Sequence, residues 1–220
     1  MRGRGGFSWS MKNPGSVLRR DSFQEPLREK TMKVLAVNGS PRKDGNTQIL
    51  IDEALKEIKK KGIETESISI ADYDIKPCNG CERCFTKSWD CPIKDDAKIV
   101  LKKMVAADGL LIGSPVYCGG VTAQLKALLD RSVMPYNSSE FKDKVGGAIT
   151  VGGAKNGGQE LTLLQLNTFF LMFDMVVASA EGGFYGGMAT GGDKGDVKRD
   201  KEGLDKARGT GRRMAHLLSK

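Results

Sequence analysis

The stretch KVLAVNGSPRKDGNT, residues 33–47, decides the fold. Its first six residues are mostly apolar and predict a buried strand. Turn residues follow, and Asn46 opens a segment with apolar residues at helical spacing, which predicts a helix over residues 46–61 that Gly62 ends. A buried strand, a polar loop and a helix in this order indicate the first unit of an α/β domain.

Strand and helix patterns alternate through the rest of the chain. We expect further strands at residues 63–70, 109–113, 145–151 and 175–179. We expect helices at residues 95–107, 121–133 and 159–173. A Gly-rich loop, residues 182–195, then leads to a terminal helix that ends near Leu218. Five strands alternating with helices predict a doubly wound parallel sheet. In the strand order 2-1-3-4-5, a mononucleotide binds where the winding reverses, so the loops after Asn38, Gly113 and Val151 should meet at one site.

Composition and charge narrow the function classes. The chain has 220 residues, 39% hydrophobic and 28% charged, and no run approaches the roughly 20 apolar residues of a membrane span. The net charge is +8, and half of it comes from a basic extension, residues 1–31, that precedes the domain at 32–220. No basic motif interleaved with aromatic residues supports nucleic-acid binding. The N-terminus has no apolar signal core, so we expect a cytoplasmic protein.

The loop after the first predicted strand carries groups that suit a phosphate. It offers hydroxyls (Ser40, Thr47), an amide (Asn46), a guanidinium (Arg42) and the N–H groups of a helix start. It matches neither the G-x-x-x-x-G-K-[ST] loop nor the G-x-G-x-x-G fingerprint, which disfavours ATP and a dinucleotide. A phosphate site and an ordinary polar loop capped by Asn46 both remain open at this point.

Four of the five cysteines fall within one short segment, residues 77–92. Cys78, Cys81 and Cys84 are each separated by two intervening residues, and Cys91 follows after six. Overlapping C-x2-C spacing lets one loop bind three corners of a [4Fe-4S] cluster, and the six-residue spacer can reach the fourth. A zinc site usually has two separate C-x2-C pairs, so it fits less well, and free thiols are the other alternative.

Three motifs in order resemble the NADPH-dependent FMN reductase branch of the flavodoxin-like proteins. They are G-S-P-R-x-x-x-N-T from Gly39, S-P-V-Y-C-G-G from Ser114, and G-G-A-K-N-G-G-Q-E from Gly152. The resemblance implies FMN, with its phosphate on Ser40, Arg42, Asn46 and Thr47. It places the flavin ring along Pro115, Val116, Tyr117, Gly119 and Gly120, with Gly152 and Gly153 on the other side. Cys118 stands where this family often has an aromatic residue, and we expect a small buried thiol there.

The cysteine segment resembles that of the iron–sulfur flavoproteins. This implies a [4Fe-4S] cluster on Cys78, Cys81, Cys84 and Cys91, and electron transfer between a ferredoxin-like one-electron carrier and a two-electron acceptor. An NAD(P)H-dependent FMN or quinone reductase without a cluster is one alternative. A non-enzymatic electron-transfer or zinc-stabilised module is the other. No acid–base residues are required, and the single histidine, His216, is expected to be a surface or packing residue.

The helix expected at 159–173 is apolar on more than one face. A helix that covers a sheet needs only one apolar stripe, so this excess predicts a homodimer or higher homo-oligomer. A larger internal core is the alternative, and the family resemblance also implies a dimer. The residues that carry this argument are Leu163, Leu166, Phe169, Phe170 and Phe173.

Overall fold

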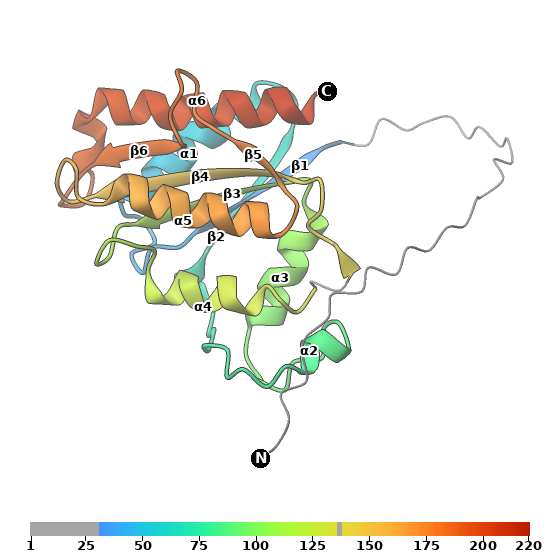
Figure 1. Ribbon diagram of the computed structural model, residues 1–220. Helices are drawn as coiled ribbons and strands as arrows, with labels where there is room; N and C mark the ends of the chain where they lie inside the picture. The colour runs from blue at the N-terminus through green and yellow to red at the C-terminus, as the bar shows by residue number, and fades with distance from the viewer. Residues whose placement is uncertain (1–30, 136–137) are drawn as a thin grey trace, which may run out of the picture. The chain divides into compact units, whose positions relative to one another are not determined.

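A parallel six-stranded sheet forms the centre of the protein (Figure 1). The computed structural model describes residues 31–135 and 138–220, so nearly all of the expected extension at 1–31 lies outside the described residues. The strands are β1 (Lys33–Asn38), β2 (Glu64–Ser69), β3 (Gly109–Pro115), β4 (Val145–Gly152), β5 (Val176–Ala178) and β6 (Gly187–Thr190). Their order is β2-β1-β3-β4-β5, which confirms the predicted doubly wound topology.

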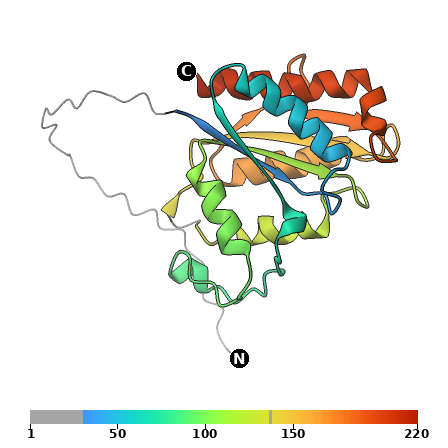
Figure 2. The ribbon, with the colours of Figure 1, turned by 180° about the vertical axis from the view of Figure 1, so that it is seen from behind.

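Helices cover both faces of the sheet, as the alternating pattern predicts. One face carries α1 (Asn46–Lys59) and α6 (Lys201–Leu218), which lie side by side in Figure 2. The other carries α3 (Ala97–Ala106), α4 (Ala123–Arg131) and α5 (Gln159–Met172). A short helix, α2 (Arg83–Thr86), lies in the cysteine segment. Within the described residues, no helix is both long and apolar enough to cross a membrane.

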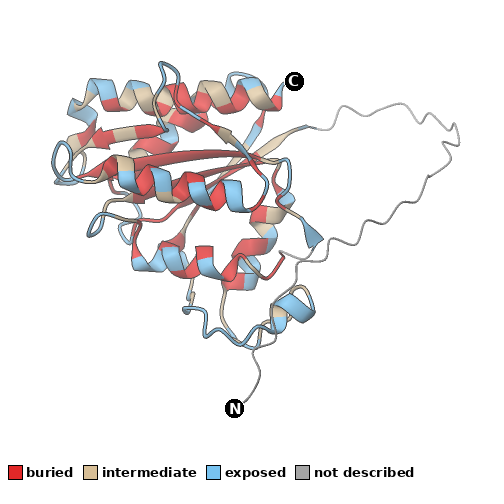
Figure 3. Ribbon diagram, in the orientation of Figure 1, coloured by how far each residue is buried: buried red, intermediate tan, exposed pale blue. Residues whose placement is uncertain are grey.

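Strand β4 shows how the core is filled from both sides (Figure 3). All eight of its residues are buried, and two adjacent glycines leave room for large side chains from opposite faces. A Cβ atom on Gly146 would come within 2.5 Å of the Phe170 ring, and one on Gly147 within 2.4 Å of the Met214 sulfur. The centre of the sheet can therefore accept α5 and α6 at close range.

Strand β6 was not predicted and corrects the expectation of five strands. Strand β4 pairs with β5 along its first residues and with β6 along Ile149–Gly152, so two short strands share one edge. Strand β6 begins with Gly187, directly follows Gly186 and precedes Gly191 and Gly192, a composition that indicates a loop. Its consequence is functional, because the loop after β6 also reaches the carboxyl edge of the sheet.

Candidate functional site: two cavities, one at the switch point and one at the cysteines

The three predicted loops meet at one cavity of about 180 Å³ at the carboxyl ends of the strands. Asn38 fixes the first loop: its side chain accepts a hydrogen bond from the Ser40 amide (3.0 Å) and donates one to the Lys43 carbonyl (3.2 Å). Predicted residues that line the cavity are Ser40, Arg42, Asn46, Thr47, Pro115, Val116, Tyr117 and Gly153.

Helix α1 begins at this cavity without a side-chain cap. Its N-cap residue is Gly45, and among the described residues the helix start has no side-chain cap hydrogen bond. The free N–H groups and the helix dipole therefore favour an anion here. Arg42 lines the same cavity, is exposed and forms no ion pair with any other described residue. These groups fit a phosphate monoester.

The second loop is a tight turn rather than a flat lining. Tyr117 and Gly120 exchange backbone hydrogen bonds of 2.9 and 3.0 Å, and Cys118 (φ 49°) and Gly119 (φ 79°) occupy the left-handed region between them. Cys118 is exposed at the tip, so the expectation of a buried thiol is wrong. Gly119 and Gly120 build this turn and do not line the cavity.

Two predicted residues hold loops in place. Asn46 donates to the carbonyls of Gly191 (3.0 Å) and Asp193 (2.8 Å) and accepts from the Gly195 amide (2.8 Å). Its side chain is thus engaged by the loop after β6. Gly152 does not line the cavity; a Cβ atom there would lie 2.5 Å from the Gln159 amide nitrogen. Asn46 therefore lines the cavity while it holds that loop, and Gly152 shapes the cavity from behind.

The loop after β6 is the part of this cavity that the sequence did not reveal. Gly191 and Gly192 line it, together with Gly45 and Val151. Asp200 anchors the loop, because its carboxylate accepts from the Thr190 amide (2.7 Å) and from Gly203 (2.9 Å) in the first turn of α6. The only sequence signal is the Gly-rich composition after an unrecognised strand.

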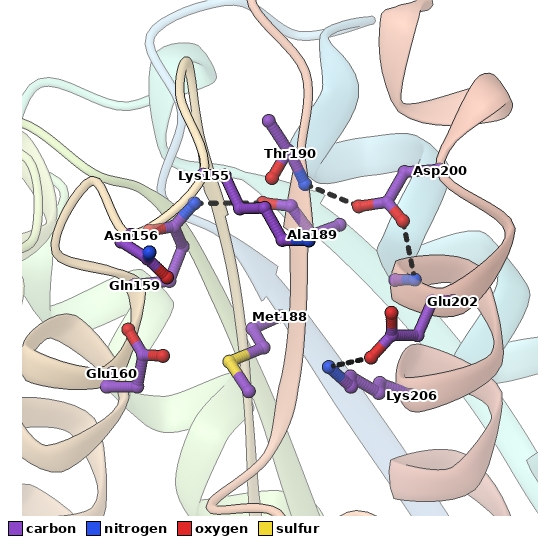
Figure 4. Close-up of a pocket in the computed structure, with 11 residues that line it drawn as sticks. Lys155, Asn156, Gln159, Glu160, Met188, Ala189, Thr190, Asp200, Glu202 and Lys206 are labelled. Atoms are coloured by element: carbon purple, nitrogen blue, oxygen red, sulfur yellow. Dashed lines mark hydrogen bonds and ion pairs between the residues drawn. The ribbon is translucent and has the colours of Figure 1, made fainter.

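A larger cavity of about 270 Å³ lies beside this loop, between α5, β6 and α6 (Figure 4). Its polar walls are largely paired, as in the contact of Lys206 with Glu202 at 2.7 Å. The side-chain oxygen of Gln159 is buried and has no hydrogen-bond partner in the part of the chain that the structure describes. None of the residues predicted to bind a cofactor lines it.

The four clustered cysteines line a separate cavity of about 70 Å³. Among the described residues none of the four forms a disulfide; Cys78 and Cys81 are exposed, and Cys84 and Cys91 are half-buried. The Gly80 amide donates to the Cys78 sulfur at 3.4 Å, and Gly80 adopts φ 66° in the left-handed region. The structure therefore places all four predicted ligands around one cavity. The switch-point cavity, which lies at the carboxyl ends of the strands, shares no lining residue with it.

The surroundings of the cysteines disfavour thiolates. Burial raises the pKa of the Cys84 thiol, and the neighbouring Cys78, Cys91 and Cys81 raise it further. Metal binding requires thiolates, so iron or another cation must offset this repulsion. Among the described residues, no three acidic, histidine or cysteine side chains converge closely enough to hold one metal ion.

The base of the cysteine segment is closed by a buried ion pair. Arg131, at the end of α4, bonds to Asp95 through Nη1 (2.7 Å) and Nη2 (3.1 Å). Asp95 also accepts from the Lys76 amide (2.9 Å), and Arg131 donates to the Lys76 carbonyl (3.0 Å). The ion pair therefore joins Lys76, just before residues 77–92, to Asp95, just after them.

Comparison with known proteins agrees with this geometry. The sequence profile described as NADPH-dependent FMN reductase matches residues 32–185. An iron–sulfur flavoprotein of Methanocaldococcus jannaschii is 48% identical over 189 residues, covering 85% of this chain and 97% of the relative. The chain belongs to the NADPH-dependent FMN reductase family and is similar to its iron–sulfur flavoproteins. It is thus a flavin-dependent oxidoreductase, and the family supports FMN as its cofactor.

Two further relatives extend the comparison. An iron–sulfur flavoprotein of Methanosarcina thermophila is 35% identical to this chain over 188 residues, covering 85% of this chain and 95% of the relative. The solved structure of RosB, which holds 8-demethyl-8-formylriboflavin-5′-phosphate, superposes with a TM-score of 0.69 at 21% identity, covering 86% of this chain and 79% of RosB. The RosB likeness shows the shared flavodoxin-like fold.

Proposed function

We propose that this flavoprotein binds FMN at the switch-point cavity and a [4Fe-4S] cluster on Cys78, Cys81, Cys84 and Cys91. It would transfer electrons between a ferredoxin-like one-electron carrier and a two-electron acceptor. The observation that carries the proposal is the pair of separate cavities, one lined by the phosphate-type loop and one by all four clustered thiols. When bound, FMN exchanges one or two electrons and the cluster exchanges one at a time.

The residues of the first cavity have distinct tasks in this proposal. Ser40, Thr47, Arg42 and the start of α1 bind the phosphate, with Asn46 holding the loop at 191–195 against it. Pro115, Val116 and Tyr117 lie along the ring, where Tyr117 is 44% exposed and can cover it. Gly119 and Gly120 shape the turn beside the ring, and Gly152 and Gly153 keep the opposite wall open.

The sequence spacing of the thiols favours a cluster over zinc. A zinc site usually takes its four thiolates from two separate C-x2-C pairs. A cuboidal cluster binds each thiolate to a different iron, and overlapping C-x2-C spacing supplies three of them from one loop. Cys78, Cys81 and Cys84 have this spacing, and they line one cavity with Cys91.

The surface beside the cysteines suits an acidic carrier. Phe85 is 55% exposed, Lys87 follows two positions later and is exposed, and Lys94 is exposed three positions after Cys91. Positive charges near an exposed apolar side chain steer a negatively charged partner. Clustered cysteines that are not joined in disulfides are typical of a reducing compartment, so we place the protein in the cytoplasm.

Replacing one ligand tests the assignment of the cluster. In Cys84→Ser, purified without oxygen, we expect iron and acid-labile sulfide to fall to a small fraction of wild type while FMN stays near one per chain, because the two cavities share no residue. Cys118→Ser is the matched control and should keep both cofactors, since Cys118 lies outside the cysteine cavity. Full iron and sulfide in Cys84→Ser would refute the proposed ligand set.

A further inference from the structure

One buried arginine lies between the cysteine segment and the rest of the fold. The side chain of Arg131 is 2% exposed and that of Asp95 is 1% exposed. Asp95 holds both terminal nitrogens of the guanidinium, and Nη1 also bonds to the Lys76 carbonyl. These contacts fix the plane and the direction of the guanidinium.

The remaining nitrogen of this arginine has no partner. Arg131 Nε is buried and forms no hydrogen bond within the described residues. Arg131 lines the cavity that all four clustered cysteines line, and its guanidinium interacts with the Cys91 sulfur. A buried donor without an acceptor is destabilising, so a ligand in this cavity that offers an acceptor is favoured.

Anchoring the chain does not require this nitrogen. The two terminal nitrogens already complete the contacts with Asp95 and Lys76, and Asp95 bonds to the Lys76 amide by itself. Nε is therefore an additional donor, fixed in direction, on the wall of a cavity that sulfur ligands surround. Iron-bound sulfur is the acceptor that matches it in that place.

We propose that Arg131 donates its Nε–H to a sulfur of the bound cluster and raises the reduction potential of the cluster. This inference rests on the proposed function. A hydrogen bond to sulfur and a nearby positive charge both stabilise the added electron, because they offset the negative charge that reduction places on the cluster. Asp95 is the positioning residue, since it aims the guanidinium and lowers its net effect through its own charge.

An anaerobic redox titration followed by electron paramagnetic resonance tests this proposal on the full chain with both cofactors. Arg131→Lys keeps the positive charge but loses Nε–H, so the midpoint potential of the cluster should become more negative. Asp95→Asn removes a negative charge while Arg131 remains, so the potential should become more positive. Arg208→Lys is the matched control: Arg208 pairs with Glu53 at 2.6 Å on the opposite face of the sheet, and the potential should not move.

Opposite shifts separate an electronic role from a structural one. A merely structural pair would lose iron in both variants and leave the potential of the remaining clusters unchanged, and that result overturns the proposal.

Labelling the arginines of the wild-type protein with ¹⁵N gives a second readout that does not depend on a variant's folding. Pulsed resonance of the reduced cluster should show one coupled arginine nitrogen, and its absence also overturns the proposal. Wild-type protein without iron or sulfide would instead refute the proposed function on which this inference rests.

Discussion

At the scale of single residues, Arg42 offers the clearest test of the phosphate site. It lines the switch-point cavity without an ion pair, whereas the adjacent Lys43 pairs with Asp72. In Arg42→Met we expect the dissociation constant of FMN, measured by quenching of flavin fluorescence, to rise roughly tenfold or more, because a charge-assisted contact to phosphate is lost. Lys43→Met should change it little. Equal effects in the two variants would mean that only the overall charge of the loop matters.

Residue types predicted the chemistry of the site better than the task of each side chain. The spacing of the cysteines was enough to place all four around one cavity, because short loops confine them. Asn46 has the composition of a phosphate ligand, yet its contacts go to residues 191–195, almost 150 positions away in sequence. Such a partner is set by tertiary packing, and no local pattern reveals it.

At the scale of elements, helix α5 has a buried face and an exposed apolar face, and the residues on which the oligomer prediction was based lie on the buried one. The five residues on which the predicted oligomer was based, Leu163, Leu166, Phe169, Phe170 and Phe173, are all buried within the chain. The larger internal core therefore explains them. A different set remains exposed along the helix: Leu161, Leu164, Leu171 and Met172, at 62, 44, 64 and 55%.

This exposed stripe supports the proposal that a second copy packs on α5. Leu164→Glu combined with Leu171→Glu should reduce the mass found by light scattering to the 23.8 kDa of one chain, because charges would be buried at the interface. Ile99→Glu, at a 52% exposed position on α3, is the control and should leave the oligomer intact. A wild-type monomer, or an unchanged oligomer in the double variant, would contradict this interface.

Strong periodicity predicted most elements, and weak periodicity accounts for those that were missed. Strands β1, β3 and β4 are long apolar runs, and their expected bounds differ from the observed ones by at most two residues. Strand β6 has the sequence Gly-Met-Ala-Thr within a Gly-rich stretch, so its pairing with β4 depends on the sheet already being present. The part of the switch-point cavity that Gly191 and Gly192 line, directly after β6, was missed for the same reason.

At the scale of the whole molecule, the two cavities divide the work of the protein. The switch-point cavity lies at the carboxyl edge of the sheet, which any doubly wound fold provides. The cysteine cavity is an addition between β2 and α3, closed at its base by Arg131 and Asp95. The strand order could be predicted because right-handed crossovers leave few alternatives. The closing ion pair could not, since it joins residues 36 positions apart in sequence.

The measurement that tests the central claim most directly is the cofactor content of the wild-type protein. The full chain would be purified without oxygen and assayed for iron, acid-labile sulfide, zinc and FMN per chain. Our account predicts about four irons, about four sulfides and one FMN, as a [4Fe-4S] cluster and one flavin require. Zinc without sulfide, or flavin without iron, would contradict it.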